Sequence, residues 1–75
     1  PAASLEVSIA DKTHNAGAIV ADRHVHGEQV WTRFTGGKDG SLWYYRALAD
    51  AFAELAPGTA SDRFARLVRE MERLA

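Results

Sequence analysis

Residues 4–10 alternate between apolar and polar residues with the period of a β-strand. Leu5, Val7 and Ile9 fall on one face of an extended chain, with serine and glutamate on the other. This period of two is typical of a half-buried strand. Two further stretches contain the β-branched and aromatic residues that favour strands. Strands are therefore predicted at residues 4–10, 18–23 and 28–35.

Polar and glycine residues between these stretches predict short connections. A polar loop at residues 11–17 separates the first two strands. Gly27 stands third in a three-residue loop before the last strand, a position that suits the left-handed conformation of a hairpin bulge. Strands joined in this way pair with their neighbours along the chain, so a three-stranded antiparallel meander is predicted.

The second half of the chain changes to a helical period. Residues 42–56 contain no glycine or proline, and Pro57 and Gly58 end this predicted helix. A last helix follows, with Thr59 or Ser61 as its cap, and ends near Leu74. In each helix the large apolar residues share one face at 3.6 residues per turn. These residues are Tyr44, Tyr45, Leu48, Phe52 and Leu55 in the first helix, and Phe64, Leu67, Val68, Met71 and Leu74 in the second.

The predicted fold is therefore α+β, with the order βββαα and a C-terminal two-helix hairpin packed on one face of the sheet. The 75 residues predict a single domain. The glycine-rich stretch 36–41 is expected to be a flexible break, with Asp39 or Ser41 capping the next helix. One alternative concerns residues 41–46, which could form a fourth strand in place of the first helical turn.

Composition limits the classes of function. The chain has no cysteine, which excludes disulfides and cysteine-ligated zinc. No apolar run approaches the roughly 20 residues that span a membrane, and residues 1–10 lack the pattern of a signal peptide. The formal net charge of −1 gives no general attraction to nucleic acid or anionic lipid. We therefore expect a cytoplasmic protein without a membrane partner, and no cofactor is predicted.

The most enzyme-like pattern consists of Asp22, His24, His26 and Glu28. Alternate residues of an extended strand project to one side. Imidazoles and carboxylates are metal ligands, and two histidines two residues apart can chelate one ion. Gly27 turns the chain within this set, however, so a solvated turn is the favoured interpretation. No catalytic residue is assigned, because no nucleophile stands beside these groups.

The last helix carries a row of arginines that could lie along nucleic-acid phosphates. Acidic residues share or flank the same face, including Asp62 and Glu70 at helical spacing from Arg66. A solvated face with ion pairs is therefore favoured, and only weak binding of DNA or RNA is expected. The arginines are Arg63, Arg66, Arg69 and Arg73.

Three apolar residues are not accounted for by one core. Val20 and Trp31 lie on the sheet face opposite Ile19, which two helices on the other face cannot cover. Trp43 projects away from the apolar stripe of its own predicted helix. Exposed tryptophans often mark interfaces, and a chain this short buries only about 60% of the surface that it exposes when unfolded. A second copy of the chain is the expected partner, and an unidentified protein is an alternative.

These observations support three hypotheses for function. The first is a non-enzymatic interaction module, a homodimeric accessory or adaptor protein that uses Val20, Trp31 and Trp43. The second is a nucleic-acid-binding regulator that uses the arginines of the last helix. The third is a small metal- or ligand-dependent enzyme that uses His24 and His26 at a subunit interface.

Overall fold

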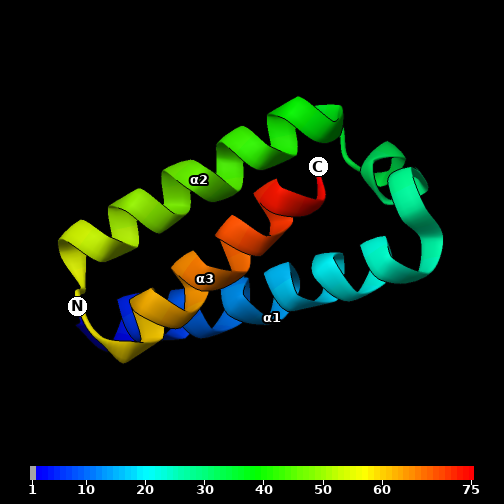
Figure 1. The fold of residues 1–75 in the computed structure, drawn as a ribbon. Coiled ribbons are helices and arrows are strands. Elements are labelled where there is room, and N and C mark those ends of the chain that lie inside the picture. The colour runs from blue at the N-terminus through cyan, green and yellow to red at the C-terminus, as the bar shows by residue number, and fades with distance from the viewer. Residues whose placement is uncertain (1) are drawn as a thin grey trace.

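Every regular element of the chain is a helix (Figure 1). The computed structural model describes residues 2–75, with side chains from Leu5 onward. It contains α1 (Ala2–His26), the 3₁₀-helix η1 (Gly27–Arg33), α2 (Gly37–Leu55) and α3 (Thr59–Leu74). Because residues 2–75 contain no strand, the prediction of an α+β fold with a three-stranded meander is wrong.

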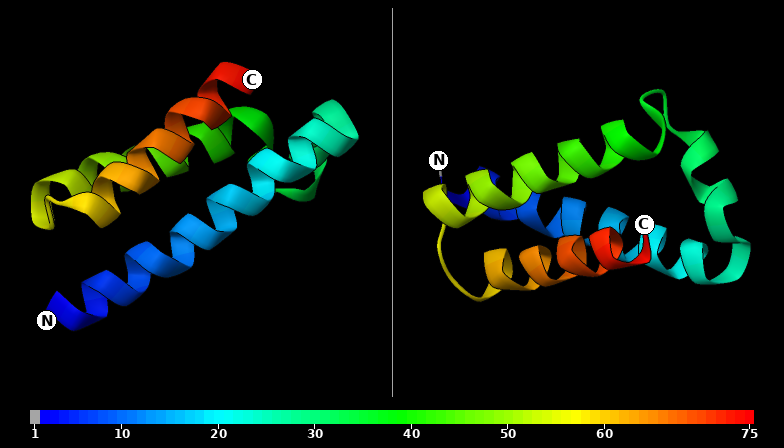
Figure 2. Two further views of the ribbon diagram at one scale, coloured as in Figure 1. Left: turned by 60° about the horizontal axis from the view of Figure 1, so that its bottom comes forward. Right: turned by 45° about the horizontal axis from the view of Figure 1, so that its top comes forward.

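The three long helices form one elongated body, with extents of 36 × 20 × 18 Å. α3 packs against both α1 and α2 (Figures 1 and 2). α1 and α3 run in the same direction, and α2 runs opposite to them. η1 crosses the end at which α1 stops and α2 begins, and it contacts both helices. None of the helices within residues 2–75 has the length and apolar character needed to cross a bilayer.

One core joins all four elements, and Phe64 of α3 stands at its centre with no exposed surface. The Phe64 ring lies 5.3 Å from the Phe52 ring and 6.2 Å from the Tyr45 ring, measured between centroids. Both of those rings come from α2. The residues of α1 and η1 that complete this core are Ile9, Ala16, Ile19, Val30 and Trp31.

The predicted first strand is part of α1 because its apolar residues also fit a helical stripe. Ile9, Ala16 and Ile19 follow one another at intervals of seven and three, which keeps them on one face of a helix. Leu5, four residues before Ile9, packs at the edge of the same core. Val7, which alternation placed beside them, lies on the opposite face and is 69% exposed.

The predicted loop at residues 11–17 and the predicted second strand at 18–23 are helical too. The loop contains no proline, so its backbone can donate every helical hydrogen bond. Gly17 costs about 1 kcal/mol relative to alanine inside a helix. Burial of Ala16 and Ile19 against the rest of the core offsets that cost, and tertiary packing thereby overrides the local preference for a loop.

Gly27 has the predicted left-handed backbone, with φ of 66°, but it does not form a hairpin bulge. It follows directly after the last residue of α1, where a left-handed glycine commonly ends a helix. The predicted third strand at residues 28–35 is instead η1 and the turn after it. Val30 and Trp31 of η1 are buried in the core.

The two predicted C-terminal helices are present as α2 and α3. α2 starts at Gly37, five residues before the predicted start, so the alternative of a fourth strand at 41–46 is excluded. Asp39 and Ser41 lie inside α2 and do not cap it; the Ser41 hydroxyl donates a hydrogen bond to the carbonyl of Gly37 (2.7 Å). The backbone of Gly58 occupies the cap position of α3.

Candidate interaction surface

The three predicted interface residues lie on three different elements and in three different environments. Trp31 in η1 is only 4% exposed, and its indole Nε1 donates a hydrogen bond to Glu28 Oε2 (2.9 Å). Val20 on α1 is half-buried at the edge of the core. Trp43 on α2 is 73% exposed. Trp31 therefore stabilises the core, and of these three residues only Trp43 presents a large apolar surface to solvent.

Beside Trp43, α2 carries a row of uncharged residues that no other helix covers fully. Successive members of this row are four, three, four and four residues apart in the sequence, so they share one face of the helix. Tyr44 is 43% exposed and Leu55 is 68% exposed. We call this row the α2 strip; it consists of Gly40, Tyr44, Ala47, Ala51 and Leu55.

Sequence reasoning assigned Tyr44 and Leu55 to the buried stripe of this helix. On the helical wheel both lie at the edge of that stripe, about 100° and 80° from Tyr45, which is buried. Their small neighbours Ala47 and Ala51 could have indicated a second, lateral face. Residues at the edge of a stripe are buried only if a neighbouring helix packs over them. The helical wheel of α2 gives no information on where α1 and α3 pack.

Two hollows lie near the start of α2. The first is between α1 and α2, and the second is between α2 and the turn that precedes it. Their volumes are about 360 Å³ and 350 Å³, and both are lined by Phe34 and Tyr45. Tyr44 forms part of the wall of the second hollow. On the α1 side the wall of the first hollow is mixed, with Asn15 and Asp22 beside apolar residues.

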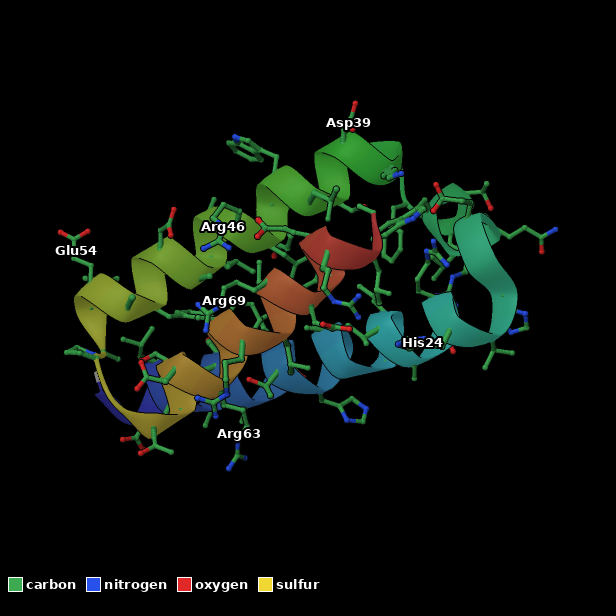
Figure 3. All side chains as sticks on the ribbon, viewed as in Figure 1. His24, Asp39, Arg46, Glu54, Arg63 and Arg69 are labelled. Carbon is green, nitrogen blue, oxygen red and sulfur yellow. The ribbon has the colours of Figure 1, made fainter. Side chains whose placement is uncertain are left out.

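Charged residues lie along the flank of α2 that also carries Trp43. Asp39 and Glu54 point away from α3, whereas Arg46 turns toward it (Figure 3). Arg46 donates from Nε and Nη2 to the two carboxylate oxygens of Glu72 on α3, at 2.9 and 2.6 Å. Its Nη1 also lies 3.5 Å from Asp50. The hydrogen bonds from Arg46 hold the pKa of Glu72 below its ordinary value of 4.5.

This pair predicts a small loss of stability in acid. A carboxylate with a lowered pKa in the folded state stabilises the fold above its unfolded pKa, and the contribution is lost as pH falls through the folded pKa. Glu72 is partly exposed, so we expect a coupling energy of about 0.2–1 kcal/mol at neutral pH that approaches zero at strongly acidic pH. Urea unfolding of Arg46→Gln, Glu72→Gln and the double variant measures it. A coupling energy that persists in acid would contradict this assignment.

The carboxylates of the predicted metal set are both engaged by cationic side chains. Asp22 accepts a hydrogen bond from Arg33 Nη2 at 2.9 Å. Glu28 accepts one from Lys38 Nζ at 2.8 Å and lies 3.3 Å from Arg23 Nε. The hydrogen bond from Lys38 is the main cause of a lowered pKa of Glu28. These contacts tie η1 to α1 and to the start of α2.

His24 and His26 do not share a face, because this segment is the last turn of a helix. Residues two apart on a helix point about 200° apart, whereas in a strand they point the same way. Both imidazoles are exposed. Across residues 2–75, no group of three or more histidine, aspartate or glutamate side chains converges in a metal-binding arrangement.

The predicted arginines on α3 are exposed but point in different directions. Arg63 lies on the α1 side and Arg69 on the α2 side (Figure 3). Arg73 Nε donates to Glu70 Oε2 at 2.9 Å. Glu70 is therefore paired with Arg73 and not with Arg66, the partner that helical spacing suggested. All four arginines are exposed: Arg63, Arg66, Arg69 and Arg73.

Comparison of the chain with protein-family models, with curated proteins and with solved structures found no match.

Proposed function

We propose that this chain is a non-enzymatic interaction module that forms a homodimer through the α2 strip and Trp43, and that it acts as an accessory or adaptor protein. The observation that carries the proposal is the 73% exposure of Trp43 beside an uncharged helical face. Tryptophan is enriched among the residues that contribute most to binding energy at protein interfaces.

The fold supports this proposal because its core does not need Trp43. The buried core, which includes Phe64, Val68 and Ile19, forms without it. A large aromatic side chain outside the core exposes apolar surface to water, which is unfavourable in an isolated monomer. Burial against a second molecule would remove that surface from water.

We further propose a cytoplasmic location. The support is that the core forms from packed side chains alone in a chain without cysteine, whereas secreted domains of this size commonly carry disulfides.

Sedimentation of the wild-type chain and of Trp43→Lys tests the proposed function. We expect the wild-type chain to sediment as a dimer at micromolar concentration. Loss of a central tryptophan contact costs about 2 kcal/mol or more, so Trp43→Lys should raise the dimer dissociation constant by at least about 30-fold. A wild-type chain that stays monomeric throughout this range would contradict the proposal.

Val25→Lys is the matched control, because Val25 on α1 is 74% exposed, nearly the same as Trp43. Both substitutions place a lysine at an exposed apolar position of a helix. Val25 lies outside the α2 strip, so the control should dimerise like the wild-type chain. If Val25→Lys dissociates the dimer and Trp43→Lys does not, the interface lies on α1.

A further inference from the structure

From the order of large and small residues along the α2 strip, we infer that two copies pair antiparallel through α2. The twofold axis then passes at the level between Ala47 and Leu48. This inference rests on the proposed function and adds the partner's orientation and register. The reason is the order of residue sizes: when a second α2 strip is placed in the reverse direction, its large residues lie opposite the small residues of the first.

Reversal about that level matches large residues with small ones. Gly40 and Leu55 are equally far from the midpoint, so Leu55 of one copy meets Gly40 of the other. Tyr44 likewise meets Ala51. An ideal Cβ built at Gly40 has no atom within 4 Å, so there is open space above it for the leucine of the second copy. Each bulky side chain thus faces a position where the partner backbone can approach closely.

A parallel pairing has no such match. Each residue would then meet its own copy, which sets Tyr44 against Tyr44 and Leu55 against Leu55. The helices would be held apart at these levels, with unfilled space where Gly40 meets Gly40 and Ala51 meets Ala51. Unfilled space at an interface forfeits van der Waals contacts. The antiparallel arrangement is therefore the one in which the α2 strip can pack without gaps.

The charged flank of α2 does not set the register. Arg46 turns toward α3, where it donates to Glu72 of its own chain, so it does not face a partner's aspartate. Asp39 and Glu54 are exposed on this flank, where water screens the repulsion between carboxylates.

The contact is small, which limits its affinity. α2 has 19 residues and is therefore about 28 Å long, and only one face of it takes part. Stable interfaces bury about 800 Å² on each partner, whereas weak and transient ones bury less. A dissociation constant in the micromolar range is expected.

Single cysteines report the register directly, because the natural chain contains none. A disulfide forms only when the two Cα atoms come within about 7 Å. Under mild oxidation, Ala47→Cys should form a covalent dimer because position 47 lies beside the axis. Gly40→Cys alone and Leu55→Cys alone should not, since each lies about 22 Å from its own copy. Mixing these two variants should restore the covalent dimer.

The outcomes separate this inference from the proposed function. A wild-type dimer in which Gly40→Cys and Leu55→Cys each cross-link to themselves would show a parallel pair and overturn the inference alone. A wild-type dimer in which neither Ala47→Cys nor the mixture cross-links would overturn it as well, because α2 would not lie at the axis. A monomeric wild-type chain would overturn both proposals.

Discussion

Phe64→Ala is expected to lower the free energy of unfolding by about 3–5 kcal/mol, which is most of the stability of a domain this small. Phe64 has no exposed surface, and its ring packs against the rings of Tyr45 and Phe52. It also lies on α3, the helix that packs against both α1 and α2. The cavity therefore weakens both helix–helix contacts. Small domains have stabilities near the low end of about 5–15 kcal/mol, so little would remain.

Urea unfolding followed by circular dichroism measures this loss. Phe64→Leu keeps most of the volume and should remain folded with a smaller loss, which gives a measurable value if Phe64→Ala is fully unfolded. Leu67→Ala on the same helix removes a half-buried side chain, so its effect should be smaller. Equal losses for Leu67→Ala and Phe64→Ala would show that Phe64 is not the centre of the core.

The C-terminal half of the fold could be predicted because local signals and tertiary packing agree there. The apolar stripe with Phe52 on α2 and the one with Phe64 on α3 have a clear helical period. Pro57 and Gly58 mark the only break between them. The start of α2 was the exception, because glycines at its first residues gave the expected signal of a flexible break.

The N-terminal half could not be predicted because its short apolar runs fit two periods. Leu5, Val7 and Ile9 alternate, but Leu5 and Ile9 are also four residues apart. The next core position is Ala16, which has no exposed surface but was counted within a polar loop. An alanine is a weak signal in the sequence, yet it lets α1 pack closely against its neighbours. The choice between strand and helix was therefore made by long-range packing.

Of the candidate surface, only those residues could be predicted whose exposure follows from the phase of their own helix. The position of Trp43 away from the apolar stripe follows from the phase of α2, and this residue is exposed as that phase indicates. Trp31 lies in a 3₁₀-helix whose aromatic and β-branched residues are typical of a strand, so its burial had no local signal. The exposure of Leu55 likewise depends on how far α1 and α3 extend beside α2.

Trp31→Ala is expected to destabilise the fold by about 3–5 kcal/mol, as is typical of a buried tryptophan truncated to alanine. Trp31 and Val30 are the buried residues of η1, the segment that links the end of α1 to the start of α2. Removing the indole opens a cavity there and deprives Glu28 of a hydrogen bond.

Trp31→Phe should cost less, because the ring retains much of the apolar volume. Gln29→Ala, an exposed change in the same segment, should stay within about 0.5 kcal/mol of the wild-type chain. Urea unfolding followed by circular dichroism compares the three variants. If Trp31→Ala and Gln29→Ala unfold at the same urea concentration, η1 does not belong to the cooperative core.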